Sequence, residues 1–227
     1  MERRARREPL AYVLGEWGFR RLTLKTDARA LVPRPETEVV VEAALELLRG
    51  LERPAVLDVG TGTGAIALAI ADEHPQARVT AIDRSREALE LARENAVRLG
   101  LVIDLLRADL ADGLPPGPFD LVVANPPYVD PAELDALEPE VRDWEPREAL
   151  VDGGQTATLA ARARDVLAPG GWLVLETHGE RAREVAEACR GLGYDPTTIR
   201  PDLAGRGRVV EARWPSSTTW SRTQSQL

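Results

Sequence analysis

Hydrophobic residues follow two alternating patterns along most of this chain. Short, almost continuous apolar runs, typical of buried strands, are separated by longer segments in which apolar residues recur at helical spacing. Strands are predicted over residues 55–59, 78–83, 102–107, 120–124, 172–176, 197–200 and 208–214. Helices are predicted over residues 65–73, 85–100, 156–167 and 180–192. Strands that alternate with helices in this way form βαβ units, so the pattern predicts an α/β fold with a mainly parallel sheet.

The first fifty residues follow a different pattern. Two short apolar runs, 11–14 and 19–24, are separated by four residues with glycine at both ends. This arrangement predicts a β-hairpin. Farther along, apolar residues at helical spacing predict a helix that stops at Gly50. Pro35 suits the first helical position, and the acidic residues that follow it favour a helix N-terminus.

Length and composition limit the domain organisation. The chain has 227 residues, of which 44% are hydrophobic and 29% are charged, as in an ordinary globular protein. This length corresponds to one large domain, or to one domain with a small appendage. We expect an N-terminal segment with the hairpin over residues 1–30 and the α/β domain over residues 31–214. The tail, 215–227, is rich in Ser, Thr and Gln and is expected to be disordered.

Charge and rare residues argue against several classes of protein. The net charge is −8, with 29 Lys and Arg against 37 Asp and Glu, so we expect no stable nucleic-acid binding, which depends on a basic surface. No apolar stretch is long enough for a membrane span or a secretory signal, and we expect a cytoplasmic protein without membrane contact. The single cysteine, Cys189, excludes an intrachain disulfide, and with only two histidines no metal site is expected.

A glycine-rich turn follows the first strand of the predicted α/β domain. It has the sequence DVGTGTG over residues 58–64 and leads into a predicted helix. Gly60, Gly62 and Gly64 have no Cβ atoms, so the backbone can turn tightly and approach a ligand closely. The N–H groups at the start of the helix can bind a carboxylate or a phosphate. The spacing, completed by Ala65, also satisfies the dinucleotide fingerprint. The motif therefore indicates a nucleoside-containing cofactor and leaves a dinucleotide and S-adenosylmethionine both open.

Two aspartates follow the next two predicted strands. In open α/β sheets, ligands bind beyond the carboxyl ends of the strands. Asp83 can accept hydrogen bonds from both hydroxyl groups of a ribose through its two oxygens. Asp109 can accept the amino group of an adenine while Leu110 packs on the ring, although Asp109 alone fits a solvated turn equally well.

The fourth predicted strand ends in Asn125-Pro-Pro-Tyr128, which distinguishes between the two cofactors. Two successive prolines cannot continue a central strand, and they leave only carbonyl acceptors on the local backbone. Together with the Asn125 side-chain oxygen and the flat face of Tyr128, they form a receptor for a planar –NH₂ group. If Asn125 Oδ1 and the Pro126 carbonyl each accept one N–H, the nitrogen lone pair is directed at a methyl donor. Positioning is then the main catalytic effect.

These segments resemble the PrmC/HemK family of peptide-release-factor glutamine methyltransferases. The resemblance extends over about residues 9–214. It rests on the sequences PLAYVLG, LVPRPETE, DVGTGTG, NPPY, EPREAL and DLAGRGR, which begin at residues 9, 31, 58, 125, 145 and 202. The NPPY element alone is shared with methyltransferases that act on other amino nitrogens. Its combination with PRPETE and the preceding hairpin is more specific.

The resemblance implies a fold, a reaction and a set of site residues. The fold is a Rossmann-like class I methyltransferase sheet of seven strands, mostly parallel, whose last strand runs antiparallel. The reaction is methyl transfer from S-adenosyl-L-methionine to the side-chain amide nitrogen of the glutamine in the Gly-Gly-Gln motif of a peptide chain release factor, the expected protein partner. The cofactor contacts implied are Asp58, Gly60, Thr61, Gly62, Thr63, Gly64, Asp83, Asp109, Leu110 and Asn125. The substrate-binding residues implied are Asn125, Pro126, Pro127 and Tyr128, of which Asn125, Pro126 and Tyr128 are the catalytic candidates.

Three weaker candidates and one departure accompany the resemblance. Arg34 and Thr37 lie in the segment that is expected to close over the methionine end of the cofactor, and Phe19 is a candidate pocket wall. Family members usually carry a helical domain before the hairpin that helps to dock the release factor. Only eight residues precede Pro9 here. Three explanations fit this departure: the sequence is the catalytic domain alone, its start is misassigned, or it is a homologue with another protein substrate. A nucleic-acid methyltransferase that uses the same loop, and a non-catalytic cofactor-binding protein, are the alternatives.

Overall fold

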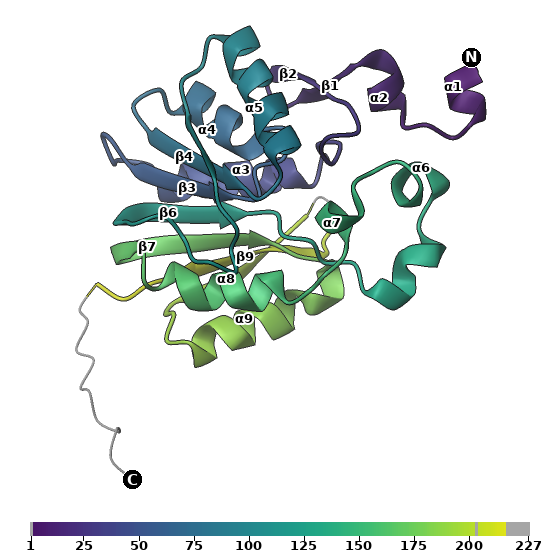
Figure 1. The fold of residues 1–227 in the computed structure, drawn as a ribbon. Coiled ribbons are helices and arrows are strands. Elements are labelled where there is room, and N and C mark those ends of the chain that lie inside the picture. Colours follow the sequence, from purple (N-terminus) through teal and green to yellow (C-terminus); the bar gives the residue numbers. More distant parts are fainter. Residues whose placement is uncertain (1, 203, 217–227) are drawn as a thin grey trace.

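A seven-stranded sheet forms the centre of the computed structural model, which describes residues 2–202 and 204–216 (Figure 1). The strand order is β5-β4-β3-β6-β7-β9-β8. The strands are β3 (Ala55–Val59), β4 (Arg78–Asp83), β5 (Asp104–Arg107), β6 (Phe119–Ala124), β7 (Leu167–Glu176), β8 (Thr197–Pro201) and β9 (Gly207–Arg213). Strands β3 to β7 pair in parallel, whereas β9 runs antiparallel to both of its neighbours. The expected fold class, a mostly parallel sheet with a reversed last strand, is confirmed.

Helices cover both faces of this sheet. In Figure 1, α3 (Thr37–Leu47), α4 (Ala65–Glu73) and α5 (Arg86–Leu99) lie on one side, and α8 (Gln155–Ala163) and α9 (Ala182–Gly191) lie on the other. Side chains alternate along each strand, so neighbouring residues serve different cores. Val56 packs with the core that holds α3 and α4, and Leu57 packs with the core that holds α8 and α9. Because both faces are covered, all five residues of β3 are buried.

The N-terminal hairpin begins later in the chain than the sequence pattern predicts. Residues 11–14, expected to be its first strand, belong instead to a helix, α2 (Leu10–Leu14). Gly15 adopts φ 76° and its N–H bonds to Ala11 O, which ends the helix. The hairpin consists of β1 (Glu16–Phe19) and β2 (Leu22–Lys25). The glycine that looks like the start of a hairpin loop is therefore a helix cap, a distinction that a five-residue helix is too short to reveal by periodicity.

The boundaries of several other elements differ from the prediction. Helix α3 begins at Thr37 rather than Pro35 and ends at Leu47. The helix predicted to reach residue 167 ends at Ala163, because β7 already begins at Leu167. The helix predicted from residue 180 begins at Ala182, after a 3₁₀ turn, η2 (Gly179–Arg181).

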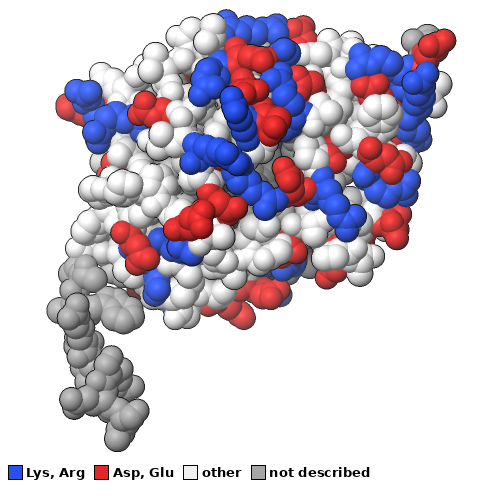
Figure 2. All heavy atoms as spheres, in the orientation of Figure 1, with Lys and Arg blue, Asp and Glu red and all other residues white. Residues whose placement is uncertain are grey.

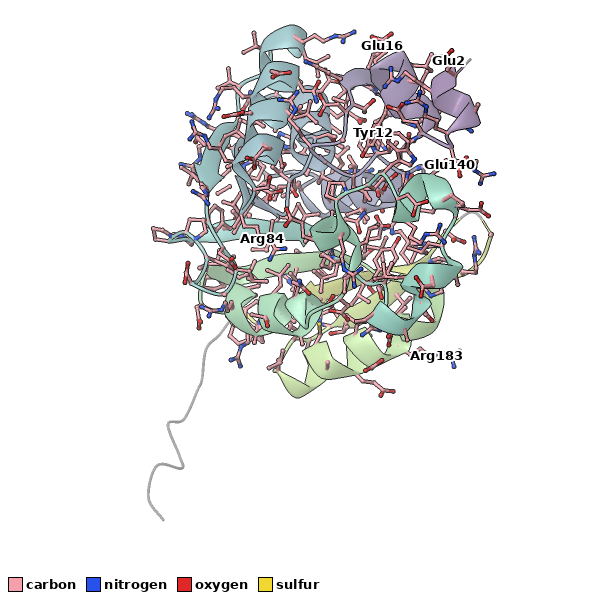
Figure 3. All side chains as sticks on the ribbon, turned by 45° about the vertical axis from the view of Figure 1, so that its right-hand side comes forward. Glu2, Tyr12, Glu16, Arg84, Glu140 and Arg183 are labelled. Atoms are coloured by element: carbon pink, nitrogen blue, oxygen red, sulfur yellow. The ribbon has the colours of Figure 1, made fainter. Side chains whose placement is uncertain are left out.

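Besides α2, the structure has four further short helices that the sequence pattern does not predict. They are α1 (Glu2–Ala5), the 3₁₀ helix η1 (Pro131–Ala136), α6 (Pro139–Arg142) and α7 (Arg147–Leu150). Helices of four to six residues give no readable periodicity. Arg4 of α1 and Arg7, which follows that helix, both pair with Glu140 of α6 (labelled in Figure 3). These ion pairs join the N-terminal segment to the chain that follows the NPPY sequence.

Two further expectations concern the C-terminal tail and membrane-spanning segments. Most of the tail predicted to be disordered, residues 217–227, lies outside the described residues. Within the described part of the chain, no helix has both the length and the apolar character that crossing a bilayer requires.

Candidate active site

A cleft lies at the carboxyl ends of the central strands. The ends of β3 and β4 line it, together with the loops that follow β3, β4, β5 and β6. Two further segments cover it, residues 29–34 ahead of α3 and the stretch around α7. The lining residues from these two segments are Arg29, Ala30, Leu31, Val32, Pro33, Arg34, Pro146, Glu148 and Ala149. The cleft therefore combines parts of the chain that are more than a hundred residues apart.

Most of the predicted site residues meet in this cleft. The cleft is lined by Gly60, Thr61, Gly62, Thr63, Asp83, Asp109, Leu110, Asn125, Pro126 and Pro127, and by the two weaker candidates Arg34 and Thr37. Phe19, expected to form a pocket wall, is 1% exposed and belongs to the core around α3 and α4. The end of β1 directs this ring into the interior, so the expectation for Phe19 is wrong.

The glycine turn between β3 and α4 depends on left-handed backbone. Gly60, Gly62 and Gly64 have φ values of 76°, 56° and 84°, which side-chain-bearing residues rarely adopt. A Cβ atom on Gly64 would lie 3.0 Å from Leu68 Cδ1. The N–H groups of Gly60 and Thr61 both bond to Ile82 O, at 2.9 and 3.0 Å, which ties the turn to the neighbouring strand. The turn thus brings bare backbone to the edge of the cleft.

Asp58 lies beneath this turn rather than in the lining of the cleft. Its side chain is completely buried, and its Oδ2 accepts a 2.7 Å hydrogen bond from Thr61 Oγ1. Its other oxygen, Oδ1, has no partner among the described residues. Burial raises the pKa of this carboxyl to about 7. The hydrogen bond between Asp58 and Thr61 therefore stabilises the conformation of the glycine turn.

Asp83 borders the cleft at the end of β4. Its Oδ2 accepts from Gly62 N–H and its Oδ1 accepts from Ser85 N–H, each at 2.9 Å. A carboxylate has about four lone-pair positions, so each oxygen can accept one more hydrogen bond. Burial raises the pKa of Asp83, whereas the two backbone N–H groups act in the opposite direction. Asp83 thus fixes the glycine turn and retains two acceptor positions.

Asp109 and Leu110 follow β5 on the same side. Asp109 Oδ1 accepts a 2.8 Å hydrogen bond from Ala111 N–H, so this carboxylate stabilises its own turn. Leu110 packs against the core beneath α8 and also lines the cleft. The pair therefore offers an acceptor and an apolar surface next to each other.

The NPPY sequence leaves the sheet at the end of β6. Asn125, Pro126 and Pro127 line the cleft, whereas the Tyr128 ring lies beside His178, with centroids 6.2 Å apart. Burial raises the pKa of the Tyr128 hydroxyl. The Tyr128 carbonyl accepts from Arg181 Nη1 at 3.2 Å, and Arg181 also pairs with Asp152 at 2.8 Å. The exit of this loop is thus tied to η2.

The Asn125 side chain belongs to a short hydrogen-bond chain. Its Nδ2 donates to Thr37 Oγ1 at 3.1 Å, and Thr37 Oγ1 donates to Glu176 Oε2 at 2.6 Å. Glu176 is completely buried at the end of β7, and burial raises its pKa to about 7. Sequence reasoning did not select Glu176. The signal was available, since Glu176 ends a parallel strand just as Asp83 does.

A second buried carboxylate holds the segment that covers the cleft. Arg34 Nη2 lies 2.7 Å from both oxygens of Glu145, whose side chain is 1% exposed. Burial raises the pKa of Glu145, and the Arg34 charge opposes this shift. Nearby, Tyr12 Oη donates to Ala30 O at 2.7 Å (Figure 3). Sequence reasoning gave no role to Glu145, because its partner lies 111 positions away.

Comparisons with known proteins identify the class to which this fold and cleft belong. Residues 37–167 match the family model of the methyltransferase small domain. A methyltransferase structure from Pyrococcus furiosus superposes with a TM-score of 0.60 over 86% of this chain and 89% of that chain, at 20% identity. The protein is an S-adenosyl-L-methionine-dependent methyltransferase with the class I fold.

More similar relatives narrow the class to a family. A release factor glutamine methyltransferase from Deinococcus radiodurans is 51% identical over 219 residues, which cover 94% of this chain and 77% of the relative. One from Geobacter sulfurreducens is 41% identical over 93% of this chain and 75% of the relative. The structure of a release-factor-specific protein-(glutamine-N5) methyltransferase from Alicyclobacillus acidocaldarius is 30% identical, with a TM-score of 0.50 over 81% of this chain and 94% of that chain. The chain belongs to the release factor glutamine methyltransferase family.

Proposed function

We propose that this protein methylates the side-chain amide nitrogen of the glutamine in the Gly-Gly-Gln motif of a peptide chain release factor. The names of its relatives support this substrate. One structural observation carries the proposal. The Asn125 amide borders the cleft next to Pro126 with its Nδ2 already bonded to Thr37, which leaves Oδ1 for a ligand.

The residues around the glycine turn fit the cofactor. Gly60 and Gly62 leave room for close approach of the ligand to the backbone, and a Cβ atom on Gly60 would meet no protein atom within 4 Å. Asp83 keeps one acceptor position on each oxygen, which suits the two vicinal hydroxyls of a ribose. We assign the adenine to the edge formed by Asp109 and Leu110, because it offers an acceptor for an amino group and an apolar surface for a ring.

The substrate glutamine would be held by two acceptors. An amide nitrogen is a poor nucleophile, because its lone pair is delocalised over the carbonyl group. If Asn125 Oδ1 and Pro126 O each accept one N–H in the amide plane, one face of the nitrogen is turned toward the methyl donor. S-adenosylmethionine would supply the methyl group: the N–C bond forms as the S–C bond breaks, the sulfonium leaves as a neutral thioether, and one proton of the nitrogen passes to solvent water. Orientation is then the main catalytic contribution of these residues.

The other residues of the loop would shape the glutamine pocket. Pro126 and Pro127 have no N–H groups, so the backbone at these two positions offers only carbonyl acceptors to an incoming amide. Tyr128 lies behind them against His178, and Arg181 fixes its carbonyl. We assign Tyr128 to the wall of the pocket, where its ring can contact the methylene groups of the glutamine.

Charge disfavours the nucleic-acid alternative. The chain has eight more acidic than basic residues. On the face shown in Figure 2, groups of Lys and Arg are bordered by groups of Asp and Glu. Binding of nucleic acid depends on a basic surface that neutralises phosphates, so we propose a protein substrate and no stable nucleic-acid partner. A release factor as substrate implies that the enzyme acts in the cytoplasm.

A labelling experiment tests this function. The protein is incubated with S-adenosylmethionine that carries a labelled methyl group and with one of three acceptors. These are a release factor, the same factor with alanine in place of the Gly-Gly-Gln glutamine, and duplex DNA. We expect label in the first acceptor alone. Label in the alanine-substituted factor or in DNA would contradict the proposed substrate, as would an unlabelled release factor.

A further inference from the structure

The catalytic use of Asn125 depends on which end of its amide faces the substrate. Its Oδ1 and Nδ2 atoms have nearly the same size, so packing alone does not distinguish between the two orientations. One orientation presents an acceptor to the glutamine N–H group, and the other presents a donor. The reaction proposed above requires the acceptor. Something in the fold must therefore select that orientation.

The neighbours of Asn125 make this selection. The amide faces Thr37 Oγ1 at 3.1 Å, and Thr37 Oγ1 faces Glu176 Oε2 at 2.6 Å. A hydroxyl has a single hydrogen to donate, and a carboxylate can only accept. The hydroxyl hydrogen of Thr37 is therefore committed to Glu176. Toward Asn125, the same hydroxyl can only accept, so the atom that faces it must be the NH₂ group.

The opposite amide orientation leaves two acceptors in contact. Oδ1 would then face Thr37 Oγ1 at about the same distance with no hydrogen between them, and the NH₂ group would point into the cleft. Unpaired polar atoms in a partly buried site are costly, and two facing oxygens also repel each other. In the orientation observed, Oδ1 has no partner among the described residues and remains available to a ligand.

We propose that Thr37 and Glu176 are positioning residues, which hold the Asn125 amide with Oδ1 toward the substrate glutamine. This inference rests on the proposed function. Neither residue needs to touch the reacting atoms, because Glu176 acts through Thr37 and Thr37 acts through Asn125. The three residues come from α3, the loop after β6 and the end of β7, so the arrangement exists only in the folded sheet.

The location of Glu176 suits a group that acts through one hydrogen bond. Its Oε1 has no hydrogen-bond partner among the described residues, so the bond from Thr37 to Oε2 is the side-chain hydrogen bond that the structure gives Glu176. The charged neighbours that act on it are Arg208 of β9, and Arg34 and Glu36 ahead of α3. Arg208 donates to Thr177 O and Asp202 Oδ2 through Nη1 and Nη2, at 3.5 and 3.2 Å, and its Nε has no partner among the described residues. On the remaining side, Tyr128 lies in the loop after β6, with His178 beside it.

Protonation of Glu176 removes the selection. The two arginines favour the charged carboxylate, whereas burial and Glu36 favour the neutral acid, and the pKa is raised to about 7. A neutral Glu176 can donate to Thr37, and the hydroxyl hydrogen of Thr37 is then free to turn toward Asn125. Both amide orientations become possible. We therefore expect the rate of methyl transfer to fall as the pH drops through about 7.

Isosteric variants test the role of each residue. Thr37→Val removes the hydroxyl without changing the shape of the side chain, and Thr37→Ser keeps the hydroxyl. We expect kcat for the release factor to fall by about tenfold to a hundredfold in Thr37→Val. In Thr37→Ser, kcat should stay within about threefold of the wild-type value, because serine also has one hydroxyl hydrogen to donate to Glu176. The dissociation constant of S-adenosylmethionine, measured by calorimetry, should change little in both variants.

Glu176→Gln tests the carboxylate. Glutamine can both donate and accept, so it no longer commits the hydrogen of Thr37. We expect kcat to fall in this variant and the acidic limb of the pH–rate profile to disappear. A purely structural role would lower stability and leave the shape of the profile unchanged.

Two matched variants control for the loss of a buried polar group elsewhere. Thr26 is buried and donates to Ala11 O at 2.9 Å, and Glu211 is buried and pairs with Arg200 at 2.7 Å. Thr26→Val and Glu211→Gln should lower the melting temperature and preserve both kcat and the pH profile. Wild-type kcat in folded Thr37→Val or Glu176→Gln would overturn the inference. So would equal losses in the two controls.

The remaining outcomes are also decisive. If Thr37→Val and Glu176→Gln both unfold, the wild-type profile decides, and a rate that is flat between about pH 5.5 and 8.5 overturns the inference. If the wild-type protein does not label a release factor, the proposed function fails and this inference falls with it. If the wild-type protein labels the factor and the variants match it, the inference alone fails.

Discussion

At the scale of single residues, identical side chains serve different purposes because their surroundings differ. Asp58 and Asp83 end neighbouring strands, β3 and β4. Asp58 is completely buried and bonds Thr61 from below, whereas Asp83 borders the cleft with acceptor positions to spare. Of the two, Asp83 lines the cleft and Asp58 does not. The two carboxylates should therefore respond to substitution in different assays.

The role assigned to Asp83 leads to a prediction about cofactor affinity. Asp83→Asn replaces one acceptor oxygen by a donor, which cannot bond both the Gly62 N–H and a ribose hydroxyl. We expect S-adenosylmethionine to bind about tenfold to a hundredfold more weakly, the range for loss of a charged hydrogen bond. Calorimetric titration measures this change. Asp120 is a matched control, because it accepts from Ala55 N–H at the opposite end of the sheet, at 2.8 Å. Equal affinity losses in Asp83→Asn and Asp120→Asn would contradict the assignment.

Substitution of Asn125 should affect the rate of methyl transfer much more than the affinity for the cofactor. Asn125→Ala removes the acceptor proposed for the substrate amide, and leaves the glycine turn and Asp83 intact. We expect kcat to fall by at least about a hundredfold, because the nitrogen is no longer oriented. The affinity for S-adenosylmethionine should fall much less. Single-turnover transfer of labelled methyl groups, together with calorimetry, separates the two quantities. Normal turnover in a folded Asn125→Ala protein would exclude the proposed mechanism.

At the scale of elements, short turns decide where the functional groups lie. Ser85 caps α5 by accepting from Ala88 N–H at 3.1 Å, and its own N–H bonds to Asp83. The same residue thus begins a helix and fixes a carboxylate at the cleft. The glycine turn acts similarly, since its backbone bonds join β3 to β4. Such turns link local structure to the site more directly than the long helices do.

Substitutions in the glycine turn can separate the effect of backbone strain on stability from the effect of an added Cβ atom on cofactor binding. Gly60 and Gly100 have φ values of 76° and 66°, and an added Cβ would meet no protein atom within 4 Å at either position. Alanine at a left-handed position costs about 1–2 kcal/mol, so Gly60→Ala and Gly100→Ala should destabilise the fold similarly in urea titrations. Gly60 borders the cleft, whereas Gly100 ends α5. Gly60→Ala alone should therefore weaken S-adenosylmethionine binding. Equal effects of the two variants on binding would argue against close backbone approach.

At the scale of the whole molecule, burial of carboxyl groups controls how stability depends on pH. Asp58 and Glu176 have pKa values of about 7 in the fold, against ordinary values of 3.8 and 4.5. At pH values between about 4 and about 7, these two carboxyl groups are protonated in the folded protein and ionised in the unfolded chain. Such groups stabilise the fold less as the pH rises through this window. The exposed Glu94 acts in the opposite way, since its ion pairs with Arg29 and Lys25 keep its pKa near 2.

We accordingly expect the free energy of unfolding to decrease from about pH 5 to about pH 8. Urea titrations at several pH values measure this slope. Asp58→Asn and Glu176→Gln should each flatten it, because each removes one buried proton-binding group. A slope that is unchanged in both Asp58→Asn and Glu176→Gln would show that these carboxyls do not titrate as described.

The sequence pattern predicted the elements whose apolar spacing is regular over enough residues. Helix α4 and strands β3 and β4 have the predicted limits, and α5 begins after Ser85 and ends before Gly100. Short elements gave no such signal. The run at 11–14 was assigned to a strand because its few apolar residues fit a helix and a strand equally well, and only the left-handed Gly15 resolves the two.

By itself, the sequence determined the sheet, the glycine turn and the NPPY loop, because each depends on residues that are adjacent in the chain or repeat at fixed spacing. The tertiary structure alone decided that Phe19 packs in the core, that Glu145 pairs with Arg34 and that Glu176 reaches Asn125 through Thr37. These contacts join residues up to 139 positions apart. Their strength comes from burial, which no local pattern encodes, since desolvation depends on everything packed around a group.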